Sequence, residues 1–456
     1  MWRRKFLLRW LSLLSTIIVI YCLIWLPTQQ NKLWPIQEIF SDKIISNDNG
    51  NSYQTESTSP SSSLVDLDLL DRILKHNHRF VVGNQEKFDR LLTENDLVFV
   101  IQVHRRPHFL FQLILSLSRI KFINETLLIF SHDFYDESIN QLIKQIDFAK
   151  TAQIFFPFST QIWSHTFPGV SDNDCPRTVD RNEAIKMNCT NINNPDSYGH
   201  FREAKITQTK HHWWWKINYI MDNFLPSQNH QGDFVFIEED HYLSPDFIHL
   251  WKLMKEIRNI FRNFTQTGKT VNLLTLGNYE KSKQSKTDFS VVHNTNWFSS
   301  HHNMAYTIDR NLWYKIKSCQ REFCSYDDYN WDWSLQHVFD QCFKQKLSTL
   351  VPRTSRVIHI GSCGLHQREK NCNESQKSKS SIGINLFLNE QNLFPERLIL
   401  QSKSLKTRRK KLRKNGGWSD PRDHFLCSHY GMFQEKLDVI FANFENLIDD
   451  LQLRTN

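Results

Sequence analysis

The residues best suited to chemistry form one short run, in which Glu238, Glu239 and Asp240 are followed by His241. They come directly after residues 233–237, whose Phe and Val side chains are typical of a strand buried in a sheet. Ligands of open α/β sheets bind at the carboxyl ends of strands, and carboxylate oxygens suit Mg²⁺ or Mn²⁺ holding a substrate diphosphate. The alternative is a strand that ends in a solvated acidic turn, because surface acids are common.

Basic residues follow an earlier strand. His104, Arg105 and Arg106 come at the end of a predicted strand at 97–103. Because arginine forks match phosphate oxygens, these side chains could contact a uridine or a phosphate, with a solvated basic loop as the alternative. A late basic run at 408–414 indicates a solvated face, or a surface that attracts an anionic ligand over a distance.

The elements that would position these residues alternate between strand and helix. Apolar patterns predict strands at 97–103, 126–130 and 152–158 and helices at 107–120 and 137–146. This alternation favours an α/β fold with a mostly parallel, doubly wound sheet. Further along, we expect helices at 211–224, 247–262 and 327–343 and strands at 271–276 and 354–360.

The N-terminus indicates a membrane anchor. Basic residues in 1–9 precede a run at 10–26 that has no charged residue and is just long enough to cross a bilayer. A cleaved signal peptide is the alternative, but the run ends in bulky residues without the small-x-small pattern of a cleavage site. We therefore expect a cytoplasmic tail at 1–9, a signal anchor at 10–26, a largely disordered luminal stem at 27–66 and a luminal catalytic domain at 67–456.

Cysteine usage agrees with an oxidising compartment. Cys22 lies inside the predicted anchor, so the other eight of the nine cysteines form an even set on the far side, none of them in a CxxC pair. A polar insertion at 172–200 carries Cys175 and Cys189 and is expected to be a disulfide-closed loop. The formal net charge of +8 is moderate and scattered, so a nucleic acid partner is not expected.

Several longer motifs occur in order along the chain. They are VIQVHRRPHFLFQLILSL, SHDFYD, ITQTKHHWWWKINYI, FIEEDHYLSPDF, HHNMA, YDDYNWDWSLQ, HIGSCGLH and RKNGGW followed by RDH. Together they resemble the N-acetylglucosaminyltransferase II family over roughly residues 90–430. This many long motifs in sequence is specific, whereas the acidic run alone is not.

The resemblance implies a GT-A-type nucleotide-sugar transferase fold in a Golgi enzyme with a type II membrane topology. It implies Mn²⁺ as cofactor, UDP-GlcNAc as donor, and β-1,2 transfer of GlcNAc to the α-1,6-arm mannose of an N-glycan acceptor. Expected partners are these substrates, the membrane and a second copy of the chain in a homodimer. The rivals are another inverting GT-A transferase with a different glycan acceptor, and a catalytically silent luminal glycan-binding protein.

The resemblance also assigns residues. The metal ligands fall on Asp240 and His359, although imidazole more often selects zinc or copper. Lys283 stands where the family has an arginine, and the loss of the bidentate fork puts its role in doubt. The donor-binding positions fall on Gln102, Val103, His104, Arg105, Arg106, Asp133, Gln208, Thr209, Lys210, His211, His212 and Lys283.

Transfer from an α-linked donor to a β-linked product inverts the anomeric carbon and needs one general base. The resemblance places this base on Asp332, while Asp327 and Asp328 remain as alternatives or as helix-capping acids. The implied disulfides join Cys175 with Cys189, Cys319 with Cys342, Cys324 with Cys427, and Cys363 with Cys372.

Overall fold

The computed structural model describes residues 65–263, 271–279, 288–361, 390–402 and 413–430, together with residues 384 and 387. The predicted tail, the anchor and almost all of the stem lie outside these ranges, as do Lys283, Cys363 and Cys372. Among the residues so described, none of the helices is long and apolar enough to cross a membrane.

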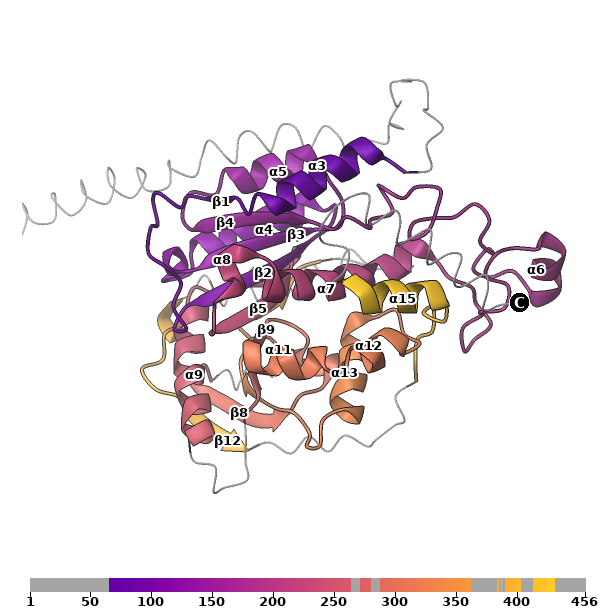
Figure 1. The fold of residues 1–456 in the computed structure, drawn as a ribbon. Helices are drawn as coiled ribbons and strands as arrows, with labels where there is room; N and C mark the ends of the chain where they lie inside the picture. Colours follow the sequence, from indigo (N-terminus) through magenta and orange to yellow (C-terminus); the bar gives the residue numbers. More distant parts are fainter. Residues whose placement is uncertain are drawn as a thin grey trace, which may run out of the picture. The chain divides into compact units, whose positions relative to one another are not determined.

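In the described part of the chain, a six-stranded sheet forms the centre of the fold (Figure 1). Its strands lie in the order β1 (Val82–Gly83), β4 (Lys150–Phe155), β3 (Leu127–His132), β2 (Leu97–Val103), β5 (Asp233–Glu238) and β9 (Tyr306–Asp309). The strands β4, β3, β2 and β5 run parallel, and the edge strands β1 and β9 are antiparallel to their neighbours. The prediction of an α/β fold with a mostly parallel sheet is confirmed.

Parallel pairing brings the ends of the central strands to one edge of this sheet. Gln102 near the end of β2 pairs with Ser131 of β3 and with Glu238 at the end of β5. The segments that follow β2 and β5 carry the basic and the acidic residues of interest. Because these strands end at the same edge, the two segments are held next to each other.

The sheet is packed between helices, namely α3 (Leu67–His78), α4 (Pro107–Ser118), α5 (Glu137–Lys144), α7 (Ala204–Asp222), α8 (Leu225–Gln228) and α9 (Phe247–Asn263). Val98 of β2 belongs to the same buried hydrophobic cluster as Trp214 of α7. The next residue, Phe99, points to the opposite face, where its ring centroid lies 5.6 Å from that of Phe247 in α9. Successive strand side chains alternate between faces, so the continuous apolar run of β2 follows from burial on both sides.

Two smaller sheets lie C-terminal to β5 in the chain. Within the described ranges, β12 (Ile399–Ser402), β8 (Val291–Asn296), β10 (Ser348–Pro352) and β7 (Leu273–Leu274) form one, and β11 (Val357–His359) with β6 (His241–Leu243) forms the other. The strands β7 and β11 are shorter than the predicted 271–276 and 354–360. The antiparallel pairing of β6 with β11 sets His241 opposite His359. This pairing therefore places β11, which is distant in the sequence, next to the end of β5.

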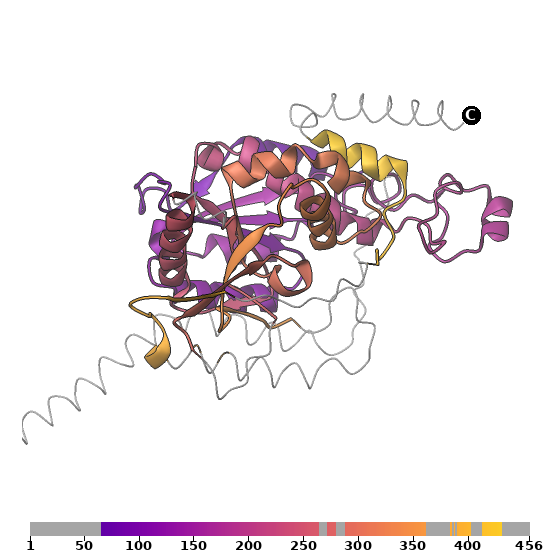
Figure 2. The same ribbon diagram turned by 90° about the horizontal axis from the view of Figure 1, so that it is seen from below.

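The remaining helices are α6 (Arg181–Met187), α10 (Ser299–His302), α11 (Arg310–Lys317), α12 (Gln320–Ser325), α13 (Trp331–Gln341) and α15 (Pro421–His429). The structure contains disulfides between Cys319 and Cys342 and between Cys324 and Cys427, the second of which joins α12 to α15. The insertion that includes α6 is closed by a Cys175–Cys189 disulfide and projects from the helices around it (Figure 2). These are three of the four disulfides expected from the resemblance.

A buried ionic cluster fixes α15 against α7. Arg202 Nε donates to both oxygens of Asp423, at 3.0 and 2.8 Å, and His211 Nε2 lies 2.8 Å from Asp423 Oδ1. The Tyr430 hydroxyl pairs with the other ring nitrogen of His211. Burial alone would raise the pKa of Asp423, but the neighbouring Arg202 and His211 hold that pKa below its ordinary value.

We expect Asp423→Asn to lower the free energy of unfolding by about 3–5 kcal/mol, because it leaves the buried Arg202 with only the more distant carboxylate of Asp174, at 3.8 Å. The depressed folded-state pKa means that the stabilisation is fully present above the unfolded pKa of about 3.9. It is lost as the pH falls through the folded-state pKa. Urea denaturation at pH 6 and at pH 3 measures both effects.

The matched control is Asp71→Asn, which removes an exposed ion pair between Asp71 and Lys75. It should change the free energy of unfolding by less than about 1 kcal/mol. Similar losses in both variants would contradict a special role for the buried cluster.

Candidate active site

The end of β5 gathers charged side chains in a buried setting. Arg106 Nε donates to Glu239 Oε1 at 2.6 Å, and Arg106 Nη1 lies 2.8 Å from Asp240 Oδ2. His359 Nε2 lies 3.3 Å from the same Asp240 oxygen. The backbone N–H of His104 donates to Glu239 Oε2 at 2.7 Å. The basic residues after β2 and the acids after β5 therefore form one cluster, as the parallel register requires.

The close contacts shift the pKa values of the neighbouring acids in opposite directions. Burial alone would raise the pKa of Asp240, but the hydrogen bond and charge of His359 and the charge of Arg106 hold it well below its ordinary value. Burial and the charge of Asp240 raise the pKa of Glu238 to about 7. Burial would lower the pKa of His359, yet its contact with Asp240 raises that pKa above the ordinary value.

The residues at the end of β5 fit a divalent cation. Oxygen or nitrogen atoms of Glu238, Asp240 and His241 lie within 4.8 Å of one another. Asp240 Oδ1 is buried and has no hydrogen-bond partner in the described part of the chain. Gly361 packs against this carboxylate so closely that a Cβ at residue 361 would overlap it. A buried carboxylate oxygen without a donor is an open ligand position for a hard cation.

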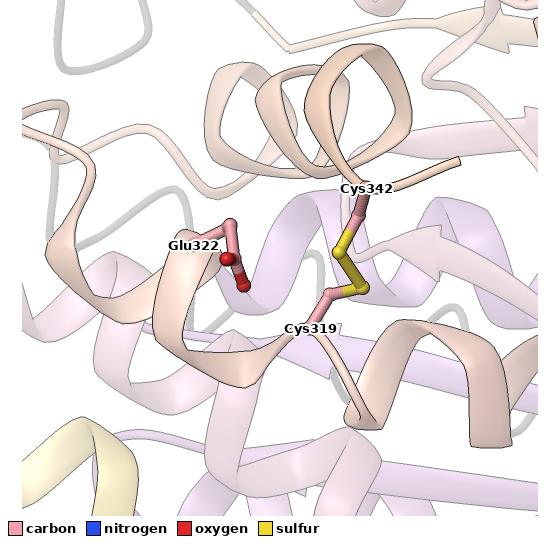
Figure 3. Close-up of side chains that lie close together, drawn as sticks. All are labelled: Cys319, Glu322 and Cys342. Atoms are coloured by element: carbon pink, nitrogen blue, oxygen red, sulfur yellow. A yellow bond between two sulfur atoms is a disulfide. The ribbon is translucent and has the colours of Figure 1, made fainter. Parts of the chain in front are cut away.

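A second group of potential metal ligands offers no open ligand position. Cys319, Glu322 and Cys342 also lie close together, but the two sulfur atoms are bonded to each other (Figure 3). A disulfide offers no thiolate, and thiolate is the form of cysteine that binds metals. This group is a structural crosslink.

The three acids of the YDDYNWDW segment have different surroundings. Asp327 accepts from the Ser197 hydroxyl at 2.6 Å and from the Trp418 backbone N–H at 3.1 Å. Asp328 is fully buried and accepts from the backbone and side chain of Asn415, at 2.9 and 3.0 Å. Both acids hold the 413–418 segment in place. Neither caps α13, which begins after Asn330, so the capping interpretation is wrong.

Asp332 lies in the first turn of α13 and is partly exposed. Its Oδ2 accepts from the Ser299 hydroxyl at 2.7 Å and from Asn303 Nδ2 at 2.9 Å. These contacts orient the carboxylate without pairing it with a cation. Asp332 is thus a partly exposed carboxylate oriented by neutral donors, and its assignment as the general base stays a prediction.

A cavity lies beside the end of β5. It encloses about 200 Å³ of empty space, including part that is open to solvent. Glu238 of β5 lies on its wall, and so does Asn303, which contacts Asp332. The complete lining consists of Gln102, Trp213, Lys216, Phe236, Ile237, Glu238, Asn303, Tyr306 and Trp331.

Some of these lining residues were not among the predicted site residues. Lys216 is fully buried and donates to Gln102 Oε1 at 2.6 Å, and burial lowers the pKa of Lys216 to about 7. Its signal in the sequence was a lysine that directly follows three tryptophans on a buried helix. Asn303 and Trp331 lie inside motifs that carried the resemblance, but their types alone suggest no chemistry.

The predicted donor-binding residues fall into two groups. The first lies at the strand edge, where His104 Nδ1 is 2.6 Å from Asp133 Oδ1 and the Arg105 guanidinium lies over the Phe134 ring. Gln208 and His212 of α7 also approach Asp133, with His212 Nδ1 3.8 Å from Asp133 Oδ2. The members that the structure brings together at this edge are Gln102, Val103, His104, Arg105, Arg106, Asp133, Gln208 and His212.

The second group consists of Thr209, Lys210 and His211, and the last two have their polar side-chain atoms committed elsewhere. Lys210 is buried, and its ammonium donates to the backbone carbonyls of Tyr326 and Asp328, both at 3.0 Å. His211 belongs to the cluster around Asp423. Thr209 lies between Gln208 and Lys210 on α7 and is partly buried. Lys210 and His211 thus hold the loop before α13 and the helix α15, and their assignment to the donor stays a prediction.

Comparison with known proteins decides the family. Residues 71–427 match the N-acetylglucosaminyltransferase II (MGAT2) family, which is well over half of the chain. The chain belongs to the N-acetylglucosaminyltransferase II family. The resemblance stated from the motifs is confirmed, and so is the prediction of a glycosyltransferase.

Individual relatives agree with this membership. The chain is 42% identical over 353 residues to the α-1,6-mannosyl-glycoprotein 2-β-N-acetylglucosaminyltransferase of Mus musculus, which covers 77% of each chain. It is 42% identical over 339 residues to the protein of that name from Homo sapiens, covering 74% of each chain. The Arabidopsis thaliana protein of the same name is 33% identical over 362 residues, covering 78% of this chain and 79% of its own length.

One solved structure, of S. aureus TarS 1–349, aligns with a TM-score of 0.29 at 6% identity, covering 57% of this chain and 59% of that chain. A likeness at this level carries no argument about the N-acetylglucosaminyltransferase II fold.

Asp328 and Asp332 should contribute differently to the free energy of unfolding. We expect Asp328→Ala to lower the free energy of unfolding by about 1–3 kcal/mol, because it removes the acceptor of several buried hydrogen bonds. Asp332→Ala should change it by less than about 1 kcal/mol, since that side chain is partly exposed. Chemical denaturation of the two variants makes the comparison. Equal losses would mean that Asp332 is as structural as Asp328.

Proposed function

We propose that this chain transfers GlcNAc from UDP-GlcNAc in β-1,2 linkage to the α-1,6-arm mannose of an N-glycan, with Mn²⁺ as cofactor and with inversion at the anomeric carbon. The observation that carries the proposal is a cavity that has on its wall both Glu238, at the end of β5, and Asn303, the partner of Asp332. Membership in the N-acetylglucosaminyltransferase II family and the activity named for its relatives support this choice of sugar and acceptor.

The donor diphosphate would lie at the strand edge. Two phosphates need positive charge, and His104, Arg105 and Arg106 bring it to the end of β2. Arg106 also contacts Glu239 and Asp240, so it ties the phosphate side of the site to the acids. A half-buried arginine held between two carboxylates keeps its charge and its orientation.

Asp240 and His359 are the residues that would hold Mn²⁺. The support is the buried Asp240 Oδ1 without a partner and the approach of His359 from β11. When bound, the ion would act as a Lewis acid that neutralises charge on the departing diphosphate. Imidazole is an unusual partner for Mn²⁺, so His359 is supported by its position and not by ligand preference.

Asp332 would act as the general base. Its carboxylate takes the proton from the acceptor hydroxyl, and the hydroxyl oxygen attacks the anomeric carbon opposite the phosphate. The bond from that carbon to the phosphate oxygen breaks, and its electron pair leaves with UDP. One displacement converts an α-linked donor into a β-linked product, so no covalent sugar intermediate forms.

The GT-A-type description of the fold and the cellular setting belong to the same proposal. The uncharged run at 10–26 would anchor the chain in the Golgi membrane with the catalytic domain in the lumen. The three disulfides suit an oxidising lumen. A homodimer remains a prediction from the resemblance.

The acceptor can be tested directly with a panel of defined N-glycans, UDP-GlcNAc and Mn²⁺. NMR of the products should show GlcNAc on O2 of the α-1,6-arm mannose, in β configuration. Transfer to the other arm would mean a different acceptor specificity. The absence of transfer to any glycan would favour a silent glycan-binding protein.

We expect Asp332→Asn to reduce kcat by about 10²–10⁴-fold, because the amide cannot take the acceptor proton. UDP affinity should be unchanged, since Asp332 lies on the acceptor side. Steady-state kinetics and calorimetric titration with UDP measure the two quantities. The matched control is Asp340→Asn, an exposed acid on the same helix, which should retain wild-type kcat. Wild-type turnover by Asp332→Asn would exclude Asp332 as the base.

We expect chelation by EDTA to abolish transfer and added Mn²⁺ to restore it. Without the ion, the negative charge that develops on the departing diphosphate is not neutralised, so the diphosphate is a poor leaving group. Asp240→Asn should lose Mn²⁺-dependent UDP binding as well as transfer. Calorimetric titration with UDP, with and without Mn²⁺, separates binding from catalysis. Equal UDP affinity of wild type and Asp240→Asn in the presence of Mn²⁺ would contradict the metal assignment.

A further inference from the structure

Asn303 lies between the catalytic carboxylate and the cavity. Its Nδ2 donates to Asp332 Oδ2 at 2.9 Å, and the residue is part of the cavity wall. Its other polar atom, Oδ1, is buried and has no hydrogen-bond partner within the described residues. The Nδ2 atom of this amide is therefore hydrogen-bonded, whereas the Oδ1 atom has no donor among the described residues.

Two hydrogen-bond donors that line the cavity are committed to other groups. The Lys216 ammonium donates to Gln102 Oε1 at 2.6 Å, and Trp213 Nε1 donates to the Tyr306 hydroxyl at 3.1 Å. A buried carbonyl oxygen without a donor is costly, and native proteins rarely keep one without a reason. The donor that completes Asn303 is thus expected to come from a ligand in the cavity.

The rest of the cavity wall is largely aromatic. The rings of Trp213 and Trp331 are stacked with centroids 5.0 Å apart and an interplanar angle of 3°, and Tyr306 lies beside them, 5.7 Å from Trp331. Aromatic walls with a few placed polar groups, here Lys216 and Glu238, are typical of pockets that bind small polar ligands.

We propose that Asn303 is a positioning residue that couples the transferred sugar to the base. Its Oδ1 accepts a hydrogen bond from the amide N–H or a hydroxyl of the donor sugar, while its Nδ2 holds Asp332 toward the acceptor. The coupling rests on the proposed function, because it needs a UDP-sugar in this cavity. Binding of the sugar then fixes the amide, and the fixed amide orients the carboxylate.

Three variants of the full-length protein separate the two ends of Asn303. Asn303→Ala removes both ends, Asn303→Asp keeps an acceptor oxygen but loses the donor to Asp332, and Ser299→Ala removes only the other hydrogen bond to Asp332. Each is titrated calorimetrically with UDP and with UDP-GlcNAc in the presence of Mn²⁺, and kcat is measured with the glycan acceptor. Thermal unfolding checks that each variant is folded.

Asn303→Ala should weaken UDP-GlcNAc binding by about five- to tenfold, the effect of one hydrogen bond, while UDP affinity stays the same. Its kcat should fall by about 10- to 100-fold because the base loses its orientation. Asn303→Asp and Ser299→Ala should lose kcat but keep the wild-type ratio of UDP-GlcNAc to UDP affinity. Repeating the titrations with UDP-glucose identifies the donor group: a loss confined to UDP-GlcNAc indicates the amide, and an equal loss indicates a hydroxyl.

The coupling is overturned if Asn303→Ala keeps the wild-type affinity ratio, since the amide would then only support Asp332. If Asn303→Ala does not fold, Asn303→Asp decides. The proposal predicts that this variant loses kcat but keeps the wild-type ratio of UDP-GlcNAc affinity to UDP affinity. A loss of both quantities, or wild-type values of both, would contradict it. All these outcomes compare a variant with a wild-type protein that binds UDP-GlcNAc. If the wild-type protein binds no UDP-sugar, the result refutes the proposed function and not only the role of Asn303.

Discussion

The site depends on the parallel register between β2 and β5. This register places Gln102 beside Glu238 and brings Arg106 onto Glu239 and Asp240. Without Arg106 and His359, burial would favour the neutral form of Asp240 and remove the charge that a cation needs. The fold therefore keeps one carboxylate ionised in a buried place and leaves one of its oxygens open.

The proposed acceptor side, around Asp332, is built by a different kind of packing. The stack of Trp213 on Trp331 fixes the start of α13 against α7, and Asp332 follows directly in the chain. Lys210 and Asp328 hold the loop before this helix, so the carboxylate is positioned by a rigid support. The two carboxylates are thus positioned by separate means, one at the sheet edge and one at a helix start, and the cavity between these elements is lined by Glu238 and by Asn303, the partner of Asp332.

Much of this arrangement could be predicted from local patterns. The apolar run of β5 followed by acids gave both the strand and the metal candidate, and the sheet followed from the alternation of elements. The start of α7 was missed because β-branched Ile206 and Thr207 disfavour helix, and tertiary packing overrides this preference. The roles of Lys216 and Asn303 could not be predicted, since they depend on which residues distant in the chain become neighbours. The same limit applies to Asp327, Asp328 and Asp332, whose different hydrogen-bond partners come from distant segments.

The most direct measurement is X-ray diffraction from crystals grown with Mn²⁺ and UDP, with anomalous data collected at the manganese absorption edge. The account predicts one anomalous peak at coordinating distance from Asp240 and His359, in contact with the diphosphate and on the same side of the cavity as Glu238. A peak bound by other residues, or UDP bound away from the ends of β2 and β5, would contradict it.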